Sequence, residues 1–311
     1  MRKLIVLLVA GIMLGLATMA TMATVAQAAQ PLVDAAWVKD NIGKPGVVFL
    51  DVRGKIDYMR GHVPGALNTN LGGDGWRVRD ANGVPGMLGK PDDLAKLIGG
   101  YGIDNSTHVV LVPWGYSAGD MGTATRIYWT FKVLGHDAVS IVNGGMATYT
   151  DVAGNPLEKG RMKAKPPAKI FKVALRADMI ATKGDVKKAL GDGTPLMDSR
   201  PNGQHLGITQ SGAAARPGTI PSAKNLPLDW LTENGGGEFR EKSALAKLFE
   251  LAGLPIEGNQ IAFCNTGYMA SVGWFAASEV LGNKKAKMYD GSLAEWTADK
   301  DLPVQSAVSL E

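Results

Sequence analysis

One cysteine, Cys264, is the residue of this 311-residue chain best suited to nucleophilic chemistry. It follows Gln260-Ile261-Ala262-Phe263, a pattern typical of a buried strand, and it precedes the polar, glycine-containing stretch 265–267. The small and apolar residues 270–277 then predict a helix. A thiol in a tight loop between a strand and a helix lies near backbone N–H groups and the positive end of the helix dipole. That setting stabilises a thiolate, which is the reactive form of cysteine.

The alternative interpretation of Cys264 is a buried structural residue, because free cysteine is among the most buried residue types. Its position at a strand end, where α/β proteins bind ligands, favours the functional interpretation. As the only cysteine it cannot form a disulfide within the chain. A metal site has little support, because the histidines show no metal-binding spacing such as H-E-x-x-H. The four histidines are His62, His108, His136 and His205.

The elements that must position this loop occur twice in the chain. Three landmarks of the first half recur 147 residues later: Asp51 as Asp198, Gly135 as Gly282, and Gly144 as Gly291. Three landmarks that share one offset indicate a duplicated domain.

Within each half, short β-branched runs alternate with helical patterns. The predicted strands are 47–52, 109–112, 139–142, 196–198, 260–264 and 286–289, and the predicted helices are 92–99, 122–134, 242–252 and 270–281. This alternation predicts an α/β fold, with a parallel sheet covered by helices on both faces. The Lys-, Pro- and Gly-rich segment 151–172 predicts a linker between a domain at 29–150 and a domain at 173–311.

The first 28 residues have the features of an export signal. Arg2 and Lys3 precede the apolar run 4–17, and Ala26-Gln27-Ala28 is typical of a cleavage site. We therefore expect a mature protein that starts near Ala29 and is periplasmic or secreted; the alternative is an uncleaved membrane anchor. Without the two leader charges the formal net charge is +4 − 2 = +2. This weak charge, with no basic stripe, argues against nucleic acid as a partner, and we expect no membrane contact after cleavage.

Six motifs occur in an order that is found in a known family. They are Asp51-Val52-Arg53, Gly61-His62-Val63-Pro64-Gly65-Ala66, Asn143-Gly144-Gly145, Asp198-Ser199-Arg200, Cys264-x-x-Gly267-x-x-Ala270 and Tyr289-Asp290-Gly291-Ser292-x-x-Glu295-Trp296. Over residues 32–303 the chain resembles the tandem-domain rhodanese sulfurtransferases, which include thiosulfate and mercaptopyruvate sulfurtransferases. The resemblance implies two rhodanese-like domains, each a mostly parallel five-stranded sheet with helices on both faces.

The resemblance further implies a sulfurtransferase whose second domain carries the nucleophile. The position that matches Cys264 in the first half falls in 113–116, which contains no thiol, so we expect that half to be catalytically silent. The Cys264 thiolate would take sulfur from a donor such as thiosulfate, become a persulfide, and pass the sulfur to cyanide, a thiol or a protein acceptor. No metal or organic cofactor is implied. We expect a monomer whose partners are a small-molecule donor and acceptor.

The site residues that the resemblance implies form two groups around Cys264. The loop and the start of the following helix contribute Asn265, Thr266, Gly267, Tyr268, Met269 and Ala270. The end of the neighbouring strand contributes Asp198, Arg200 and Gln204. The pair Asp198 and Arg200 is expected to brace the loop, or else to be a purely structural ion pair. Tyr268 and Met269 are expected at the rim of a pocket, with the core as the alternative for Met269.

Two basic positions of the family's thiosulfate enzymes are uncharged here. Asn265 and Thr266 stand in a loop that carries basic residues in those enzymes, and Gln204 stands where an arginine often binds the donor. The candidates to replace this charge are Arg200, Arg216 and His205. A mercaptopyruvate-type donor is therefore an alternative, although Tyr268 is larger than the residue usual in those enzymes.

Two other functions compete with sulfur transfer by turnover. Phosphatases of related fold need an arginine at the end of a longer cysteine loop, and no arginine occurs between Cys264 and Glu311. This argues against a phosphatase. A carrier that holds the persulfide and delivers it to a protein partner is the second alternative.

Overall fold

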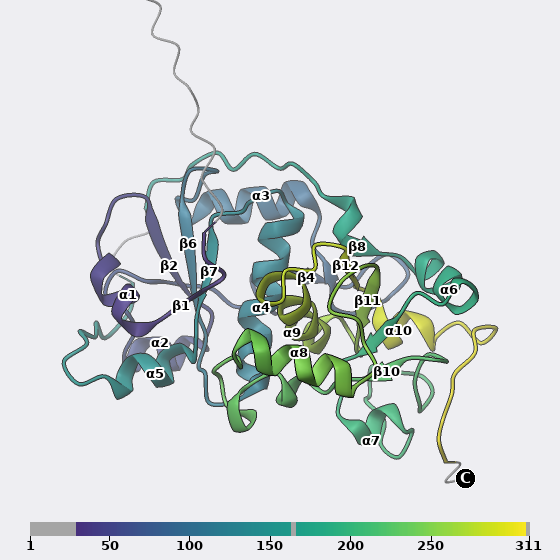
Figure 1. Cartoon of the computed structure of the whole chain (residues 1–311). Coiled ribbons are helices and arrows are strands. Elements are labelled where there is room, and N and C mark those ends of the chain that lie inside the picture. The colour runs from purple at the N-terminus through teal and green to yellow at the C-terminus, as the bar shows by residue number, and fades with distance from the viewer. Residues whose placement is uncertain (1–28, 163–165, 309–311) are drawn as a thin grey trace, which may run out of the picture.

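The computed structural model describes residues 29–162 and 166–308, so the leader predicted over 1–28 lies outside the described residues. Two α/β units lie side by side and meet along helices α4 and α9, at the centre of the molecule (Figure 1). Among the described residues, no helix is both long enough and apolar enough to cross a membrane.

The first half forms a five-stranded sheet of order β1-β7-β6-β2-β3, and every pairing in it is parallel. Its strands are β1 (Leu32–Val33), β2 (Val47–Asp51), β3 (Leu67–Asn68), β6 (His108–Val112) and β7 (Val139–Val142). Its helices are α1 (Ala35–Asn41), α2 (Lys55–Arg60), α3 (Pro91–Gly100), α4 (Ala118–Val133) and α5 (Gly145–Asp151). Alternate strand residues point to opposite faces. Phe49 and Val110 pack with residues of α1, α2 and α5, whereas Leu50 and Leu111 pack with residues of α3 and α4, so helices cover both faces.

The second half repeats this plan with a sheet of order β10-β9-β11-β12-β8, again with parallel pairings throughout. Its strands are β8 (Ile180–Ala181), β9 (Leu196–Asp198), β10 (Lys224–Asn225), β11 (Gln260–Phe263) and β12 (Ala286–Tyr289). Its helices are α6 (Lys183–Asp192), α7 (Asn202–His205), α8 (Lys242–Leu251), α9 (Tyr268–Phe275) and α10 (Ser292–Trp296). Short 3₁₀ turns lie at Ala177–Met179, Leu228–Trp230 and Glu233–Gly235, and a π-helical turn at Ala276–Val280 extends α9. The central strands of both sheets are β6 and β11, which are flanked in turn by β2 and β7 and by β9 and β12.

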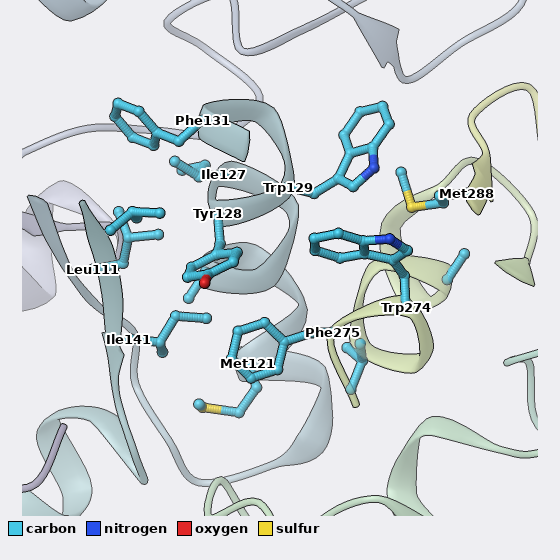
Figure 2. Close-up of a cluster of buried hydrophobic side chains, with 14 of the residues drawn as sticks. Leu111, Met121, Ile127, Tyr128, Trp129, Phe131, Ile141, Trp274, Phe275 and Met288 are labelled. Atoms are coloured by element: carbon cyan, nitrogen blue, oxygen red, sulfur yellow. The ribbon is translucent and has the colours of Figure 1, made fainter. Parts of the chain in front are cut away.

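One hydrophobic core joins the two halves. Figure 2 shows Tyr128 and Trp129 of α4 on the side of Trp274 and Phe275 of α9, and Ile127 and Phe131 of α4 on the side of Leu111 and Ile141. Tyr128 of α4 meets the ring of Phe275 edge to face at 4.9 Å, and its hydroxyl donates to Glu279 at 2.8 Å. Burial raises the pKa of Tyr128 well above its ordinary value. Because this core is continuous across the chain, the two halves are fixed against each other by packing.

The six predicted strands agree with the structure to within one residue, whereas the two-residue strands β1, β3, β8 and β10 were not predicted and helix boundaries differ for local reasons. Helix α4 begins at Ala118, four residues before the predicted start, because Ser117 and Asp120 form a reciprocal capping box. The helix predicted at 270–281 is α9 followed by the π-helical turn. An antiparallel hairpin, β4 (Arg77–Val78) and β5 (Met87–Leu88), is absent from the prediction. Its strands are two residues long and lack a hydrophobic period.

The segment predicted as a linker follows the surface of the first half. His62 and Glu158 exchange two backbone hydrogen bonds of 3.0 Å, and the amide of Lys169 donates to Gly99 at 2.9 Å. The described part of this segment therefore has defined backbone partners and is not a free tether.

Candidate active site

Cys264 lies directly after β11, at the edge of the second sheet where the strands end, and α9 begins four residues later. The loop between them turns at Gly267, which has φ +70° and precedes the first residue of α9. A Cβ atom at Gly267 would lie 2.4 Å from Nη1 of Arg126 and 2.8 Å from Oδ1 of Asp290. Only glycine combines this left-handed backbone with so close an approach.

Ser292 fixes the shape of the cysteine loop through hydrogen bonds from two of its amides. The amides of Cys264 and Gly267 both donate to its Oγ at 3.1 Å, and Oγ donates to the carbonyl of Tyr289 at 2.8 Å. Ser292 itself has φ +48°, which is unfavourable for a residue with a side chain. Backbone strain at Ser292 thus accompanies the placement of one hydroxyl under two amides of the loop.

The surroundings of the sulfur differ from the sequence-based expectation of converging amides. Two of the loop amides point to Ser292, and no described group donates a hydrogen bond to the sulfur of Cys264. The amides of Asn265 and Thr266 have no acceptor within the described residues. The Cys264 side chain is fully buried. Four surface cavities in the described part of the chain have no residue of the cysteine loop, 264–267, in their lining.

Asp198 and Arg200 form a buried bracket at the end of β9. Arg200 donates to Asp198 at 2.8 Å and 2.6 Å and to the carbonyl of Gly218 at 2.9 Å. Asp198 also accepts from Thr219 at 2.8 Å and lies 3.1 Å from Nδ1 of His205. Burial alone would raise the pKa of Asp198, but the hydrogen bonds and charge of Arg200, with those of His205 and Thr219, lower it below its ordinary value. These contacts join β9 to the segment before β10 and do not touch the cysteine loop.

Gln204 of α7 does reach the loop. Its Oε1 accepts from Nδ2 of Asn265 at 2.8 Å. The Oδ1 atom of Asn265 is buried and has no hydrogen-bond partner among the described residues. The structure therefore brings Gln204 and Asn265 together with Cys264, as expected from the sequence.

The three residues considered as sources of the missing positive charge are engaged elsewhere. Arg200 and His205 bind Asp198. Arg216 donates to three backbone carbonyls near the C-terminal end of the described chain, those of Thr297, Asp299 and Leu302. Among the described residues, none of the three forms a hydrogen bond or ion pair with residues 264–267.

Two arginines of the first half lie against the loop in their place. Nη2 of Arg77, on β4, donates to the carbonyl of Thr266 at 2.5 Å. Nη1 of Arg126, on α4, pairs with Asp290 at 2.5 Å and donates to the carbonyl of Gly267 at 3.3 Å. Sequence analysis missed both, since neither belongs to a motif and each contact joins residues more than a hundred positions apart. The one available signal was the absence of basic residues in the loop itself.

Arg77 and Cys264 are close enough to influence each other electrostatically. Burial lowers the pKa of Arg77, and the charge of Arg126 lowers it further. A negative charge at Cys264 and the carboxylate of Asp290 act in the opposite direction and raise the pKa of Arg77. Arg77 is thus a cation of the first half that lies against the cysteine loop of the second.

Tyr268, Met269 and Ala270 start α9, and the hydroxyl of Tyr268 is directed to helix α4. Its hydroxyl donates to the carbonyl of Gly119 at 2.6 Å and lies 2.9 Å from Oγ1 of Thr123, both in α4. A Cβ atom at Gly122 would lie 2.7 Å from the Tyr268 ring, so this glycine lets the ring lie on the helix. Burial raises the pKa of Tyr268. Met269 packs against the shared core and Ala270 is fully buried within it.

The comparisons with known proteins agree with this architecture. The rhodanese-like domain profile matches residues 34–151 and 182–299. A Mycobacterium tuberculosis (strain CDC 1551 / Oshkosh) protein named "Putative thiosulfate sulfurtransferase" is 31% identical over 289 residues, which cover 88% of this chain and 97% of the relative. The "Sulfur carrier protein TtuD" of Thermus thermophilus is 31% identical over 290 residues, covering 88% of this chain and 96% of the relative.

A solved structure with the same fold is that of the anaerobic ergothioneine biosynthesis enzyme from Chlorobium limicola. It superposes with a TM-score of 0.76 at 22% identity, over 89% of this chain and 70% of that one. At this identity the likeness concerns the fold alone.

Proposed function

The chain belongs to the rhodanese family, as a tandem of two rhodanese-like domains, and we propose that it is a sulfurtransferase that carries sulfane sulfur as a persulfide on Cys264. One observation carries this proposal. The only thiol of the chain lies at the strand-end loop of the second domain, and Arg77 of the first domain donates to the carbonyl of Thr266 in that loop. The matching loop of the first domain contains no thiol.

The loading step transfers one sulfur atom from donor to enzyme. The Cys264 thiolate attacks the outer sulfur of thiosulfate, an S–S bond forms to the enzyme, and the S–S bond of thiosulfate breaks to release sulfite. One negative charge remains on the enzyme as the persulfide and two leave with sulfite. The free amides of Asn265 and Thr266 and the guanidinium of Arg77 are the nearby donors suited to these anions.

The second step regenerates the enzyme. Cyanide, as the acceptor, attacks the outer sulfur of the persulfide and leaves as thiocyanate, and the thiolate of Cys264 returns. No proton is transferred in either step with these two substrates. The site therefore needs anion stabilisation more than it needs a general base.

Access to the thiol requires movement, because Cys264 is fully buried. The contacts that close over the loop come from residues 77–88 of the first domain: Arg77 binds Thr266, and the amide of Leu88 donates to Asp290 at 2.6 Å. We propose that donor entry opens these polar contacts while the α4–α9 core stays packed. Polar contacts at an edge separate at lower cost than a continuous apolar core.

A mercaptopyruvate-type donor is the second candidate, favoured by the uncharged side chains of Asn265 and Thr266. Its thiol sulfur would pass to Cys264, and the thiol proton would return to the carbon of the pyruvate that leaves. A donor panel of thiosulfate, thiosulfonates and mercaptopyruvate, compared by kcat/KM with cyanide as acceptor, separates these candidates. We expect thiosulfate or a thiosulfonate to give the highest value, and a higher value for mercaptopyruvate would replace the proposal.

One relative is named a sulfur carrier protein, so a protein acceptor is a further alternative to a small-molecule acceptor. A protein that loads sulfur in one round but shows no steady-state turnover with cyanide or small thiols would be a carrier for a protein acceptor. Turnover that is abolished in Cys264→Ser supports the enzyme.

We also propose that the mature protein acts outside the cytoplasm. The support is the leader pattern that ends at Ala26-Gln27-Ala28. N-terminal sequencing of protein from the native host should start near Ala29, and a start at Met1 would contradict cleavage.

A further inference from the structure

We propose that Arg77, from the domain without a thiol, is the residue that binds the anionic part of the sulfur donor and so selects negatively charged donors. This inference rests on the proposed function, because it assigns the donor subsite of the same reaction. It also answers which residue replaces the basic side chains absent from the cysteine loop.

The guanidinium of Arg77 is held in place by backbone carbonyls. Its Nε donates to Gly86 at 2.9 Å and its Nη2 donates to Thr266 at 2.5 Å. Its Cζ lies 6.0 Å from the centre of the Tyr268 ring. Nη1 makes no hydrogen bond to any described residue. Two anchored nitrogens fix the plane of the group, and the third keeps donors for a ligand.

The charge of Arg77 is compensated less closely than that of its neighbour, because Asp290 acts on Arg77 without forming an ion pair with it. Arg126 is fully buried and is neutralised by Asp290 at 2.5 Å. Arg77 is half-buried and forms no ion pair with a described carboxylate. A buried charge without a partner is costly. An anion at Cys264, first as thiolate and then as donor, supplies the missing partner.

The backbone around Arg77 has one glycine that its position requires. Gly86 has φ +82°, and a Cβ atom there would lie 2.0 Å from Nη2 of Arg77 and 3.1 Å from Cβ of Thr266. A side chain at residue 86 would therefore push Arg77 away from the loop. This packing points to a position for the guanidinium that is set by the fold.

The chemistry gives such a cation a defined use. Thiosulfate carries negative charge on the oxygens of its central sulfur, the atom bonded to the sulfur that is transferred, and sulfite leaves with two negative charges. An arginine binds such oxyanions with two parallel N–H groups. Thiosulfate and thiosulfonates, whose leaving group is an oxyanion of sulfur, are the donors that this residue is placed to bind.

The test uses Arg77→Met and Arg77→Lys, with Arg79→Met as the matched control. Arg79 lies two residues away in the same hairpin, is exposed, and contacts only the carbonyl of Gly83 among the described residues. The first readout is the rate of persulfide formation from thiosulfate, followed by intact mass. We expect Arg77→Met to load about 10- to 100-fold more slowly, the effect of one charged hydrogen bond. Arg77→Lys should lose less, and Arg79→Met should match the wild type.

The second readout separates charge from structure. The ratio of Cys264 alkylation rates with anionic iodoacetate and neutral iodoacetamide reports the charge near the sulfur. This ratio should fall in Arg77→Met and be retained in Arg77→Lys, whereas a merely structural role would change both rates alike. If Arg77→Met does not fold, Arg77→Gln takes its place in both measurements.

The outcomes distinguish this inference from the proposed function. Equal loading by Arg77→Met and Arg79→Met, or an unchanged alkylation ratio, overturns the assignment of Arg77 while sulfur transfer stands. Failure of the wild type to load any sulfur from the donor panel overturns the proposed function. A fall in the alkylation ratio would in that case still support Arg77 as the charge that faces Cys264.

Discussion

The two strand-end loops of this protein, 113–116 after β6 and 264–267 after β11, occupy equivalent places in their domains and differ in charge. In each, the helix that follows the next strand donates to the first loop carbonyl: Met146 to Pro113 at 2.9 Å and Leu293 to Cys264 at 3.0 Å. The donors are 147 residues apart. The backbone frame of a sulfur-transfer loop is thus present twice, and only one copy carries a thiol.

Each loop is also contacted by a segment of the opposite domain. The amide of Leu88 donates to Asp290 beside the cysteine loop, and the amide of Phe239 donates to Asn143 beside the silent loop, at 2.6 Å and 2.9 Å. Asn143 and Asp290 are equivalent positions, 147 residues apart. The exchange of segments is therefore shared, whereas the carboxylate of Asp290 and the contacts of Arg77 and Arg126 are found at the cysteine loop.

The silent loop shows what the frame does without chemistry. A Cβ atom at Gly237 would lie 2.2 Å from the carbonyl oxygen of Gly115, and one at Gly115 would lie 1.8 Å from that of Gly144. Trp114 donates to Asp57 at 3.2 Å and stacks under Arg53. Here the loop serves as a close backbone contact between domains. The comparison shows that the shared backbone arrangement of the two loops connects the domains. Sulfur transfer requires in addition the thiol and the charged residues of the cysteine loop.

Asp290→Asn introduces the amide that stands at the equivalent position beside the silent loop, Asn143. Among the substitutions considered, we expect this one to reduce stability most. The amide oxygen can still accept from Leu88, but Arg126 stays fully buried and loses the one carboxylate that pairs with it among the described residues. Removal of one partner of a buried ion pair costs about 3–5 kcal/mol. The free energy of unfolding in urea measures this loss. The matched control, Asn143→Ala, removes one neutral hydrogen bond and should cost about 1 kcal/mol; equal losses would contradict the distinction.

Ser292→Ala tests the hydroxyl that the silent loop lacks. Its equivalent there is Gly145, with φ +58°. The variant keeps the strained backbone of Ser292 and leaves the amides of Cys264 and Gly267 without an acceptor, so we expect a loss of about 2 kcal/mol. Ser292→Gly should lose less, since it relieves the backbone strain. Thermal unfolding of both variants checks this order, and a more stable Ala variant would refute it.

Tyr268→Phe tests the contact of α9 with α4 and should have a smaller effect. It removes hydrogen bonds to Gly119 and Thr123 but keeps the ring, so we expect a loss of about 1 kcal/mol. Gly122→Ala should cost more, because its Cβ atom would lie 2.7 Å from the ring. The same urea titration measures both. A larger loss in Tyr268→Phe than in Gly122→Ala would show that the hydroxyl, rather than the close packing, holds the helices together.

The smallest effect that we expect is that of pH on the stability of the protein near neutrality. The pKa of Asp198 is lowered in the folded state, so its contribution to stability is fully present above the ordinary carboxyl value of about 3.9 and is lost as the pH falls through the folded-state pKa. Between about pH 8 and 5 we expect no loss from this group. Below about pH 4 the wild type should lose stability faster than Asp198→Asn; parallel acid limbs for the two proteins would contradict this role.

Much of the fold was predictable from the sequence because the strands of a parallel sheet are buried and leave continuous apolar runs. Residues such as 109–112 and 139–142 are in the predicted strands, and the repeat at 147 residues indicated two copies of one plan. The cysteine loop was located by the same logic, at the end of β11. Gln204, expected near the loop from its sequence position after β9, accepts from Asn265 at 2.8 Å.

The remainder depends on contacts that no local pattern encodes. The contact of Arg77 with Thr266 joins residues 189 positions apart, and the short strands of its hairpin have no hydrophobic period. The sequence also suggested a sulfur surrounded by amides, whereas two of those amides bind the hydroxyl of Ser292. The role of Ser292 could not be predicted, because it depends on the fold bringing the turn after β12 next to the cysteine loop.

The most direct test of the central claim is the intact mass of the protein after exposure to thiosulfate and removal of excess donor. We expect the wild type to gain about 32 Da, one sulfur atom bound as a persulfide, and to lose it when cyanide is added. Cys264→Ser should gain nothing. A wild type that gains no mass, or a Cys264→Ser variant that gains the same mass, would contradict the account.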